Sequence, residues 1–406
     1  MILVMKKNIL LFFLAVLSVC NLFAADLEVK DQHYRRISLC SMLVKHSEDK
    51  FAKEIEEQFL VIPISEQYND HNLSVRVVSV DKKGKYTPNI HNFVEANEIA
   101  SRLVAKWFNR NILTGECNVD LVKERGLYDA SAFDIELSKR SQRGMAMLAD
   151  AGEDLIGRTY LLVNEIVYVD KGKRSRTWGA VLGALTAVAG AAAGVDTSDF
   201  ADLTESMISS IKGFKVKINT RLYRLNWSEE NQMFFYSECY SEGKDFAKME
   251  NFEKGRGKFS MTYVGDVTSK GSTTSFLGIN EDQPELMIRK ACQRAIDENV
   301  ADLQKAYDEF RIKTPIVSVE PTITAKIGLK EGIDKDSRFE VLEAEEKDGR
   351  IVYKRVGVVK PIPTKIWDNR FMATEEGAYG AEFGATTFVK ESGRDFYPGL
   401  LLRQIN

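Results

Sequence analysis

The sequence predicts an α+β protein in which a mixed α/β body precedes a small all-β domain. Three observations support this fold class: a strand with two-residue alternation at Phe214–Leu222, a long closing helix at Pro284–Phe310, and many strand–turn alternations after that helix. We therefore expect the body over residues 25–312, with a Gly/Ala-rich helical insertion at 172–212, and a small β-barrel or sandwich over 313–406.

The first 24 residues have the three parts of a secretory signal peptide. The pair Lys6-Lys7 precedes an apolar run at Ile9–Val19, and the small residues Ala24-Ala25 follow. The run is too short to span a bilayer comfortably. We therefore expect a signal peptide over 1–24 and an exported protein of a Gram-negative bacterium, periplasmic or associated with the outer membrane.

The cysteines give no sign of a lipid anchor, a zinc site or a redox site. Leu17–Cys20 resembles a bacterial lipobox, but Val19 stands where the peptidase needs a small residue, so lipidation at Cys20 is not expected. No two cysteines form a C-x-x-C pair. Buried free thiols or a single disulfide are both compatible with the four that remain after cleavage: Cys40, Cys117, Cys239 and Cys292.

The first half of the body alternates predicted strands and helices. Buried strands are expected at Phe59–Ile64 and Leu73–Val80, and a further strand at Tyr160–Val169. Apolar residues at helical spacing predict a helix over Asn92–Arg110, with Asn92 as its N-cap. A second helix is expected over Ser131–Asp150.

The second half of the body begins with the alternating strand at Phe214–Leu222. The segment Trp227–Asn231 is typical of a turn, and the run at Met233–Tyr240 then predicts the second strand of a long hairpin. The helix at Pro284–Phe310 begins with a proline, whose missing N–H costs little at the first helical position.

Pro315 and Pro321 mark the start of the C-terminal domain. Beyond them, the dipeptide Asp348-Gly349 separates apolar-alternating runs at Phe339–Leu342 and Ile351–Val359. Asp-Gly between two such runs is the strongest short-range signal for a β-hairpin. We therefore expect these runs to pair.

The same domain contains one candidate interface, formed by Trp367 and Arg370. They lie in the turn-rich cluster Trp367–Arg370, and Trp and Arg are over-represented among interface hot spots. A loop that packs on its own barrel is the alternative interpretation of the cluster.

The most unusual segment is Thr177–Val195, which contains no charged residue and consists mainly of Ala and Gly. At 1.5 Å per residue, its nineteen residues reach about 28 Å, close to the thickness of a bilayer core. Its spaced glycines share one helix face, which lets two helix backbones approach closely: Gly179, Gly183, Gly190 and Gly194. The segment resembles the glycine zippers of bacterial outer-membrane proteins. Self-association or membrane insertion, a buried core helix and a mobile insertion loop all remain open.

Composition and motifs argue against nucleic-acid binding and catalysis. With 56 Lys and Arg against 59 Asp and Glu, the chain lacks the basic excess of a nucleic-acid-binding protein. It has no G-x-S-x-G, H-E-x-x-H or Walker motif, and its four histidines all lie before residue 92. We expect a protein that is not an enzyme, with no catalytic, cofactor-binding or metal-binding residue. A hydrolase without a familiar motif is the remaining alternative.

The order of elements resembles two families of envelope proteins. The strand ending at Val61-Ile62-Pro63, the strand from Leu155-Ile156-Gly157, the hairpin and the closing helix are similar to the periplasmic domain of curli-secretion (CsgG-like) proteins. The segments Ala325–Gly328 and Phe339–Leu342 resemble the small C-terminal β-domain of flagellar assembly protein T. These resemblances imply an assembly role in the periplasm or at the outer membrane. No functional residue carries over from either family.

Two functions follow from these features. The first is a non-enzymatic exported envelope protein with an assembly, secretion or scaffold role, whose partners are itself, through the glycine stripe at 179–194, or other envelope proteins. The second is a soluble periplasmic module that binds a ligand or a partner, with the Gly/Ala helix as part of its core.

Deletion of Thr177–Val195 distinguishes these two functions. If the glycine stripe mediates self-association or membrane association, the wild-type protein sediments with the outer membrane and the deletion releases it. If the segment is core, the deletion instead abolishes cooperative thermal unfolding. Envelope fractionation and thermal melts of both proteins measure the difference. A wild-type protein that is wholly soluble and monomeric would contradict the first function.

Overall fold

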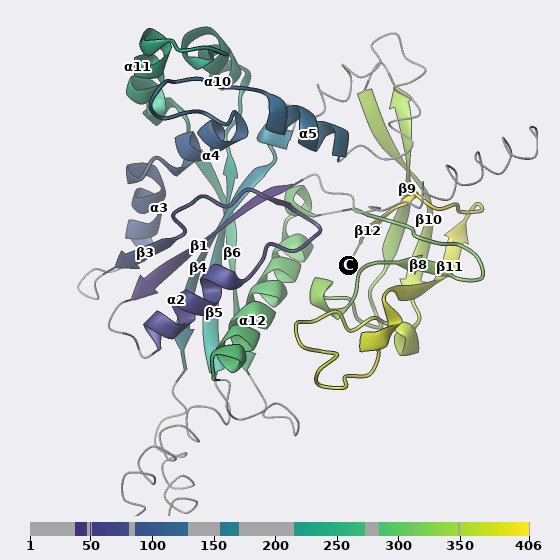
Figure 1. Cartoon of the computed structure of the whole chain (residues 1–406). Helices are drawn as coiled ribbons and strands as arrows, with labels where there is room; N and C mark the ends of the chain where they lie inside the picture. Colours follow the sequence, from purple (N-terminus) through teal and green to yellow (C-terminus); the bar gives the residue numbers. More distant parts are fainter. Residues whose placement is uncertain are drawn as a thin grey trace, which may run out of the picture. The chain divides into compact units, whose positions relative to one another are not determined.

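The computed structural model describes residues 37–46, 49, 51–80, 86–128, 155–169, 215–272, 284–311, 313–347 and 350–405. They form a mixed sheet with helices on both faces (sheet A) and an antiparallel, nearly closed barrel-like sheet (sheet B), and they belong to one compact unit, Tyr34–Asn406 (Figure 1). The predicted α+β class is therefore confirmed. The signal peptide, the insertion at 172–212 and the helix predicted at Ser131–Asp150 lie outside the described residues.

Sheet A has the strand order β2-β1-β4-β5-β6, with β3 also paired to β1. Strands β2, β3 and β4 run parallel to β1, whereas β5 and β6 continue the sheet in antiparallel fashion. The strands are β1 (Ser38–His46), β2 (Asn69–Asp70), β3 (Val77–Val80), β4 (Thr159–Tyr168), β5 (Lys215–Leu225) and β6 (Met261–Ser272). The sequence correctly predicted β4 and β5.

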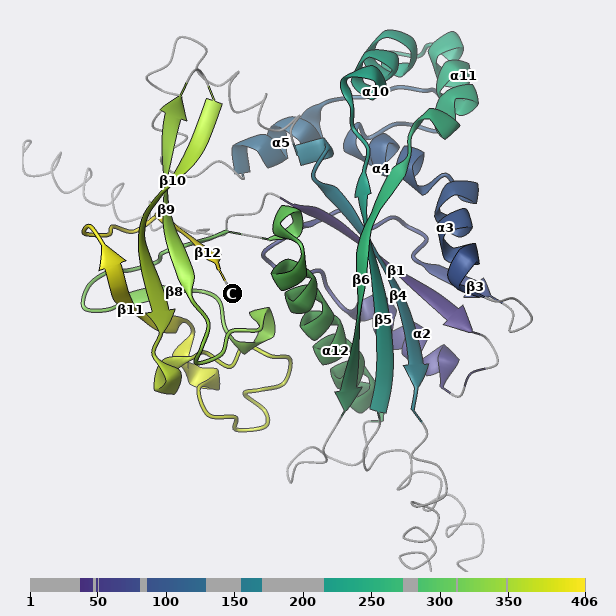
Figure 2. The ribbon, with the colours of Figure 1, turned by 180° about the vertical axis from the view of Figure 1, so that it is seen from behind.

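The central strand β1 escaped prediction because both of its faces are buried. Leu43 packs with α2 (Ala52–Val61) and α12 (Pro284–Ala306), while Met42 and Val44 pack with α3 (Tyr86–Ala96) and α4 (Ile99–Trp107) on the opposite face. A strand covered on both sides lacks the apolar–polar alternation that marks a half-exposed strand. Figures 1 and 2 show helices on the two faces of the sheet.

Two predictions near the N-terminus were wrong. The run Phe59–Ile64 is the last turn of α2 and the loop after it, because Ile55 and Phe59 lie on one buried helix face while Leu60 and Val61 are exposed. Only the last four residues of the strand predicted at Leu73–Val80 form β3.

The helix predicted over Asn92–Arg110 is two helices. They are α3 (Tyr86–Ala96) and α4 (Ile99–Trp107), so Asn92 is not an N-cap. Between them Glu98 adopts a left-handed conformation with φ of 51°, which breaks the helical path. A further helix, α5 (Asp120–Tyr128), follows α4.

The hairpin predicted through Trp227–Asn231 was also wrong, because Met233–Cys239 is helical and β6 is the antiparallel partner of β5. Ser228 caps the first turn by accepting a hydrogen bond from the Asn231 amide (3.3 Å). The helical elements of this region are α10 (Glu229–Phe234), the π-helix η1 (Phe235–Cys239), α11 (Phe246–Gly255) and the 3₁₀ turn η2 (Arg256–Lys258).

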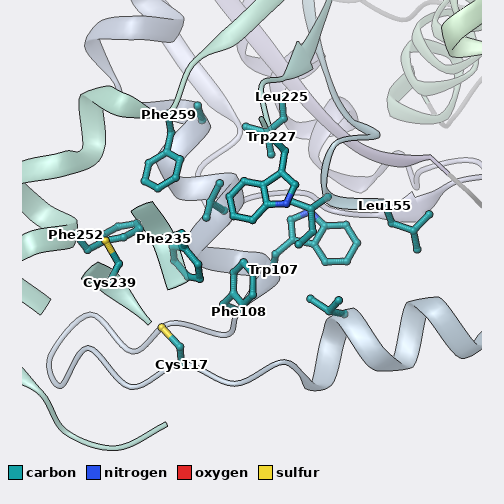
Figure 3. Packing of buried hydrophobic residues seen from close by; sticks show 14 residues of the cluster. Trp107, Phe108, Cys117, Leu155, Leu225, Trp227, Phe235, Cys239, Phe252 and Phe259 are labelled. Atoms are coloured by element: carbon teal, nitrogen blue, oxygen red, sulfur yellow. The ribbon is translucent and has the colours of Figure 1, made fainter. Parts of the chain in front are cut away.

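Tertiary packing explains why these aromatic residues do not form a strand. Phe235 and Cys239 are fully buried in an aromatic cluster with Trp107, Phe108 and Phe252 (Figure 3). The ring of Phe235 lies 4.2 Å from that of Phe108, between centroids. Aromatic residues favour strands only where a sheet surface can bury them, and here a helical cluster does so.

Sheet B has the strand order β7-β12-β9-β10-β11-β8 and surrounds its own apolar core. The predicted runs Phe339–Leu342 and Ile351–Val359 fall within β9 and β10, which pair as expected, while the turn Asp348-Gly349 lies outside the described residues. The strands are β7 (Thr314–Pro315), β8 (Ile323–Ala325), β9 (Phe339–Lys347), β10 (Arg350–Pro361), β11 (Thr386–Gly393) and β12 (Leu401–Gln404). Short 3₁₀ turns are η3 (Asp308–Phe310), η4 (Leu329–Glu331), η5 (Pro363–Lys365) and η6 (Ala381–Phe383).

Helix α12 contacts both parts of the structure. On its sheet A side, the Asn299 amide donates a hydrogen bond to the Thr220 hydroxyl (2.8 Å). On the other side, Lys290 and Arg294 both form ion pairs with Glu376, from the segment between η5 and η6. The side chains of Lys290 and Glu376 are only 2% and 7% exposed. Buried charges of this kind are tolerated only when they are paired.

Replacement of Glu376 by Gln is expected to destabilise the fold by about 3 kcal/mol, because it leaves two cations without their counter-charge in a water-poor environment. Urea unfolding followed by circular dichroism measures this loss. The adjacent exposed residue provides the control, since Glu375→Gln removes the same charge outside the cluster. Equal stabilities of the two variants would show that the ion cluster contributes nothing.

Candidate functional site

A cleft lies between α12, the loop that follows α2, and η4. Leu39 and Leu162 of sheet A form part of its wall, together with Phe59 from the end of α2. Its enclosed part measures about 40 Å³, enough for the head group of a small molecule. Clefts between structural units are common positions for ligand sites.

Two hydrogen-bond acceptors in this cleft lack a donor. The Oε1 atom of Gln67 and the Oδ2 atom of Asp297 are both buried, and neither has a hydrogen-bond partner within the described part of the chain. The whole Gln67 residue is only 7% exposed. Because a buried polar group without a partner costs about 1–3 kcal/mol, a donor supplied by a ligand or by water would stabilise this arrangement.

The electrostatics of the cleft centre on Asp297. Burial raises the pKa of this carboxyl to about 7, with the Lys330 ammonium opposing the shift and the Glu331 carboxylate reinforcing it. Burial also raises the pKa of Glu331. Asp297 therefore changes its charge near neutral pH, a property that structural surface carboxylates lack.

Glu331 is positioned by the loop that contains the predicted interface cluster. Its Oε2 atom accepts hydrogen bonds from the Gly328 amide and the Asn369 side chain, both 2.7 Å long. A side chain at position 328 would not fit, because a Cβ atom there would lie 2.2 Å from the Trp367 carbonyl oxygen. Glycine therefore lets η4 approach this loop closely.

The two residues predicted to form an interface, Trp367 and Arg370, do not line the cleft. Trp367 donates its indole N–H to the Ala381 carbonyl (3.2 Å), and Arg370 forms two hydrogen bonds with Asp368 (2.8 and 2.6 Å). Both side chains are half-buried. Of the two residues between them in the sequence, Asn369 is the one that contacts the candidate site, through its hydrogen bond to Glu331.

Hydrogen bonds and aromatic contacts hold the loop that contains Gln67. The Gln304 amide of α12 donates to the Tyr68 hydroxyl, and the Tyr68 ring stacks on Phe310 at 5.6 Å between centroids. Two cations, Lys330 and Arg76, also line the cleft. The site therefore combines two positive charges with hydrogen-bond acceptors that have no donor within the described residues.

The histidines of the described residues lie outside this cleft. His71 is fully buried and has both ring nitrogens engaged: Nε2 donates to the Leu103 carbonyl (3.0 Å) and Nδ1 accepts from Arg125 (2.9 Å). These partners fix the neutral tautomer, and burial followed by the Arg125 charge holds the pKa of His71 well below its ordinary value.

The four cysteines of the described residues are free thiols, all of them buried: Cys40, Cys117, Cys239 and Cys292. Burial raises the pKa of Cys40 and Cys239 to about 11 and that of Cys292 to about 12. Such thiols are poor nucleophiles at neutral pH. No group of three or more His, Cys, Asp or Glu side chains that could hold a metal ion occurs in the described ranges.

The glycine stripe predicted to mediate membrane or self-association lies outside the described residues: Gly179, Gly183, Gly190 and Gly194. Within the portion that the structure describes, no helix combines the length and apolar character needed to cross a bilayer. Neither protein-family models nor curated proteins show a match to this chain. The resemblances to curli-secretion proteins and to flagellar assembly protein T therefore stay predictions.

Replacement of Asp297 by Asn is expected to change how stability depends on pH. The raised pKa means that the folded state keeps its proton up to about pH 7, whereas the unfolded chain loses it near pH 4. The contribution of Asp297 to the free energy of unfolding of the wild-type protein therefore falls as the pH rises from about 4 to about 7. Relative to wild type, Asp297→Asn should gain about 1–2 kcal/mol more at pH 8 than at pH 5.5.

Urea titrations at the two pH values measure this difference. Asp302→Asn is the matched control, because Asp302 is an exposed carboxylate of the same helix. If Asp297→Asn and Asp302→Asn change the free energy of unfolding by the same amount between pH 5.5 and pH 8, Asp297 is ionised throughout this pH range.

Proposed function

We propose that the protein is a non-enzymatic binding module that recognises a small molecule through an ammonium or amide group. The observation that carries this proposal is the pair of buried acceptors without donors, Gln67 Oε1 and Asp297 Oδ2, in one cleft. Ligand N–H groups that reach these two atoms would satisfy them. This corresponds to the soluble ligand-binding alternative derived from the sequence.

The charges of the cleft define the ligand further. Above about pH 7 Asp297 is ionised and attracts an ammonium group, while below this pH it is neutral and the attraction weakens. Lys330 and Arg76 line the same cleft and offer their positive charges to a carboxylate. A small zwitterion such as an amino acid therefore fits the site better than a simple cation.

The chemistry of the cleft favours binding over catalysis. Nucleophilic catalysis needs a nucleophile and a base within hydrogen-bonding distance of each other. Among the residues that the structure describes, no His or Cys lines the cleft, and the hydroxyl of one lining serine, Ser41, accepts a hydrogen bond from Asn164 (2.9 Å). These features support a role without bond making or breaking.

Export to the envelope remains part of the proposal, on the grounds of the sequence at 1–24 alone. The assembly or scaffold role, with self-association through the glycine stripe at 179–194, also rests on the sequence. A binding module can serve such a role, since ligand occupancy of a cleft between two structural units changes the stability of their contact.

Thermal melts in the presence of small donors test the proposed function. At concentrations about ten times the dissociation constant, ethanolamine and glycine should raise the melting temperature by about 2 °C, whereas acetate, which has no donor, should not. The glycine effect should be larger at pH 8 than at pH 5.5, because only ionised Asp297 attracts the ammonium group.

Two variants and a control locate the effect. Gln67→Leu and Asp297→Leu, which remove the acceptors, should abolish the response to glycine, whereas the exposed replacement Asp302→Asn should retain it. A folded wild-type protein that responds to none of the donors would disprove this function.

A further inference from the structure

A second pocket, separate from the cleft on α12, combines arginines with exposed apolar side chains. It lies between α4, the loop before β3, and α11, and has a volume of about 200 Å³. Three arginines line it, one from each of α4, the segment after α4, and η2: Arg102, Arg110 and Arg256. None of its residues lines the cleft described above.

Arg110 is the fixed part of this pocket. Its side chain is only 1% exposed, its guanidinium lies 4.1 Å from the centroid of the Phe252 ring, and it pairs with Glu253 at 3.2 Å. Its Nε–H group nevertheless has no acceptor among the residues that the structure describes. A buried cation with an unused donor is the arrangement that an anionic ligand would complete.

The charges in the pocket are not balanced. Arg256 pairs with Glu253 (2.6 Å) and Glu98 (3.1 Å), so these two carboxylates neutralise Arg256 and Arg110. The side chain of Arg102 is exposed and makes no ion pair or hydrogen bond within the described ranges. One positive charge therefore remains for a ligand.

The edge of the pocket is apolar. Val75 and Ile112 both line it, and they are 60% and 74% exposed. Exposed aliphatic side chains beside a cationic pocket would bury an apolar group attached to the anion. Each methylene buried there would raise affinity about fourfold.

We propose that this pocket binds an anionic amphiphile, with its phosphate on Arg102 and Arg110 and its apolar chain against Val75 and Ile112. The phosphate can belong to a lipid in a bilayer or to a dissolved molecule. The recognition chemistry is the same for both sources, because arginine presents its N–H groups in a fork that matches phosphate oxygens.

Isothermal titration calorimetry of the full chain with inorganic phosphate and hexyl phosphate tests this proposal. Hexyl phosphate should bind at least tenfold more tightly than phosphate. Arg102→Gln should weaken the binding of both at least fivefold, whereas Ile112→Ser should weaken only that of hexyl phosphate. Because both residues are exposed, neither change should alter the thermal melt.

Two matched controls exclude general effects of charge and hydrophobicity. Leu113→Ser replaces the exposed neighbour of Ile112, which does not line the pocket, and Lys123→Gln removes one exposed positive charge from α5. Both should bind like wild type. Equal binding by wild type and Arg102→Gln, or equal affinities for phosphate and hexyl phosphate, would overturn the proposal.

Co-sedimentation with vesicles of phosphatidylcholine, with and without phosphatidylglycerol, identifies the source of the anion. Binding only to vesicles that contain phosphatidylglycerol, lost in Arg102→Gln, supports the pocket with a membrane lipid as its ligand. Binding of hexyl phosphate without co-sedimentation supports the pocket with a dissolved amphiphile as its ligand.

Discussion

The structure depends on one constraint, the burial of helix α12 on two sides. Its apolar side packs on sheet A, as any amphipathic helix would. Its other side carries a polar stripe at helical spacing, and that stripe contacts other structural elements instead of solvent: Lys290, Arg294, Asp297 and Gln304. Buried polar groups require partners, so the elements around α12 must supply them. Glu376 and Tyr68 do so, while Asp297 Oδ2 has no hydrogen-bond partner among the residues that the structure describes.

Elements with one apolar and one polar side could be predicted from the sequence. The two-residue alternation in β5 and the helical spacing of apolar and polar residues in α12 both mark such sides. Strand β1 could not be found in this way, because its two buried faces remove the alternation. The segments Phe59–Ile64 and Met233–Tyr240 were misassigned because apolar and aromatic runs fit both a strand and a buried helix, and only tertiary contacts decide between them.

The candidate cleft could not be predicted, since Gln67 and Asp297 are 230 positions apart in the sequence and meet only through the packing of α12. The sequence did contain one feature related to this cleft, the polar residues of α12. The polar residues of this stripe on α12 recur at spacings of four, three and seven, as on a solvated helix face, and nothing in the sequence distinguishes a solvated stripe from a buried one. The predicted interface residues Trp367 and Arg370 lie in the loop next to this cleft, and the residue of that loop that contacts Glu331 is Asn369.

The position of β1 also affects the order in which the protein can fold. The ribosome completes β1 more than one hundred residues before β4, its longest partner. Until then the strand has one edge unpaired, and the side chains of its two faces have few permanent neighbours. Contacts between segments so distant in sequence form slowly and expose aggregation-prone surface meanwhile. A newly made chain therefore carries an open strand edge for longer than its finished architecture suggests.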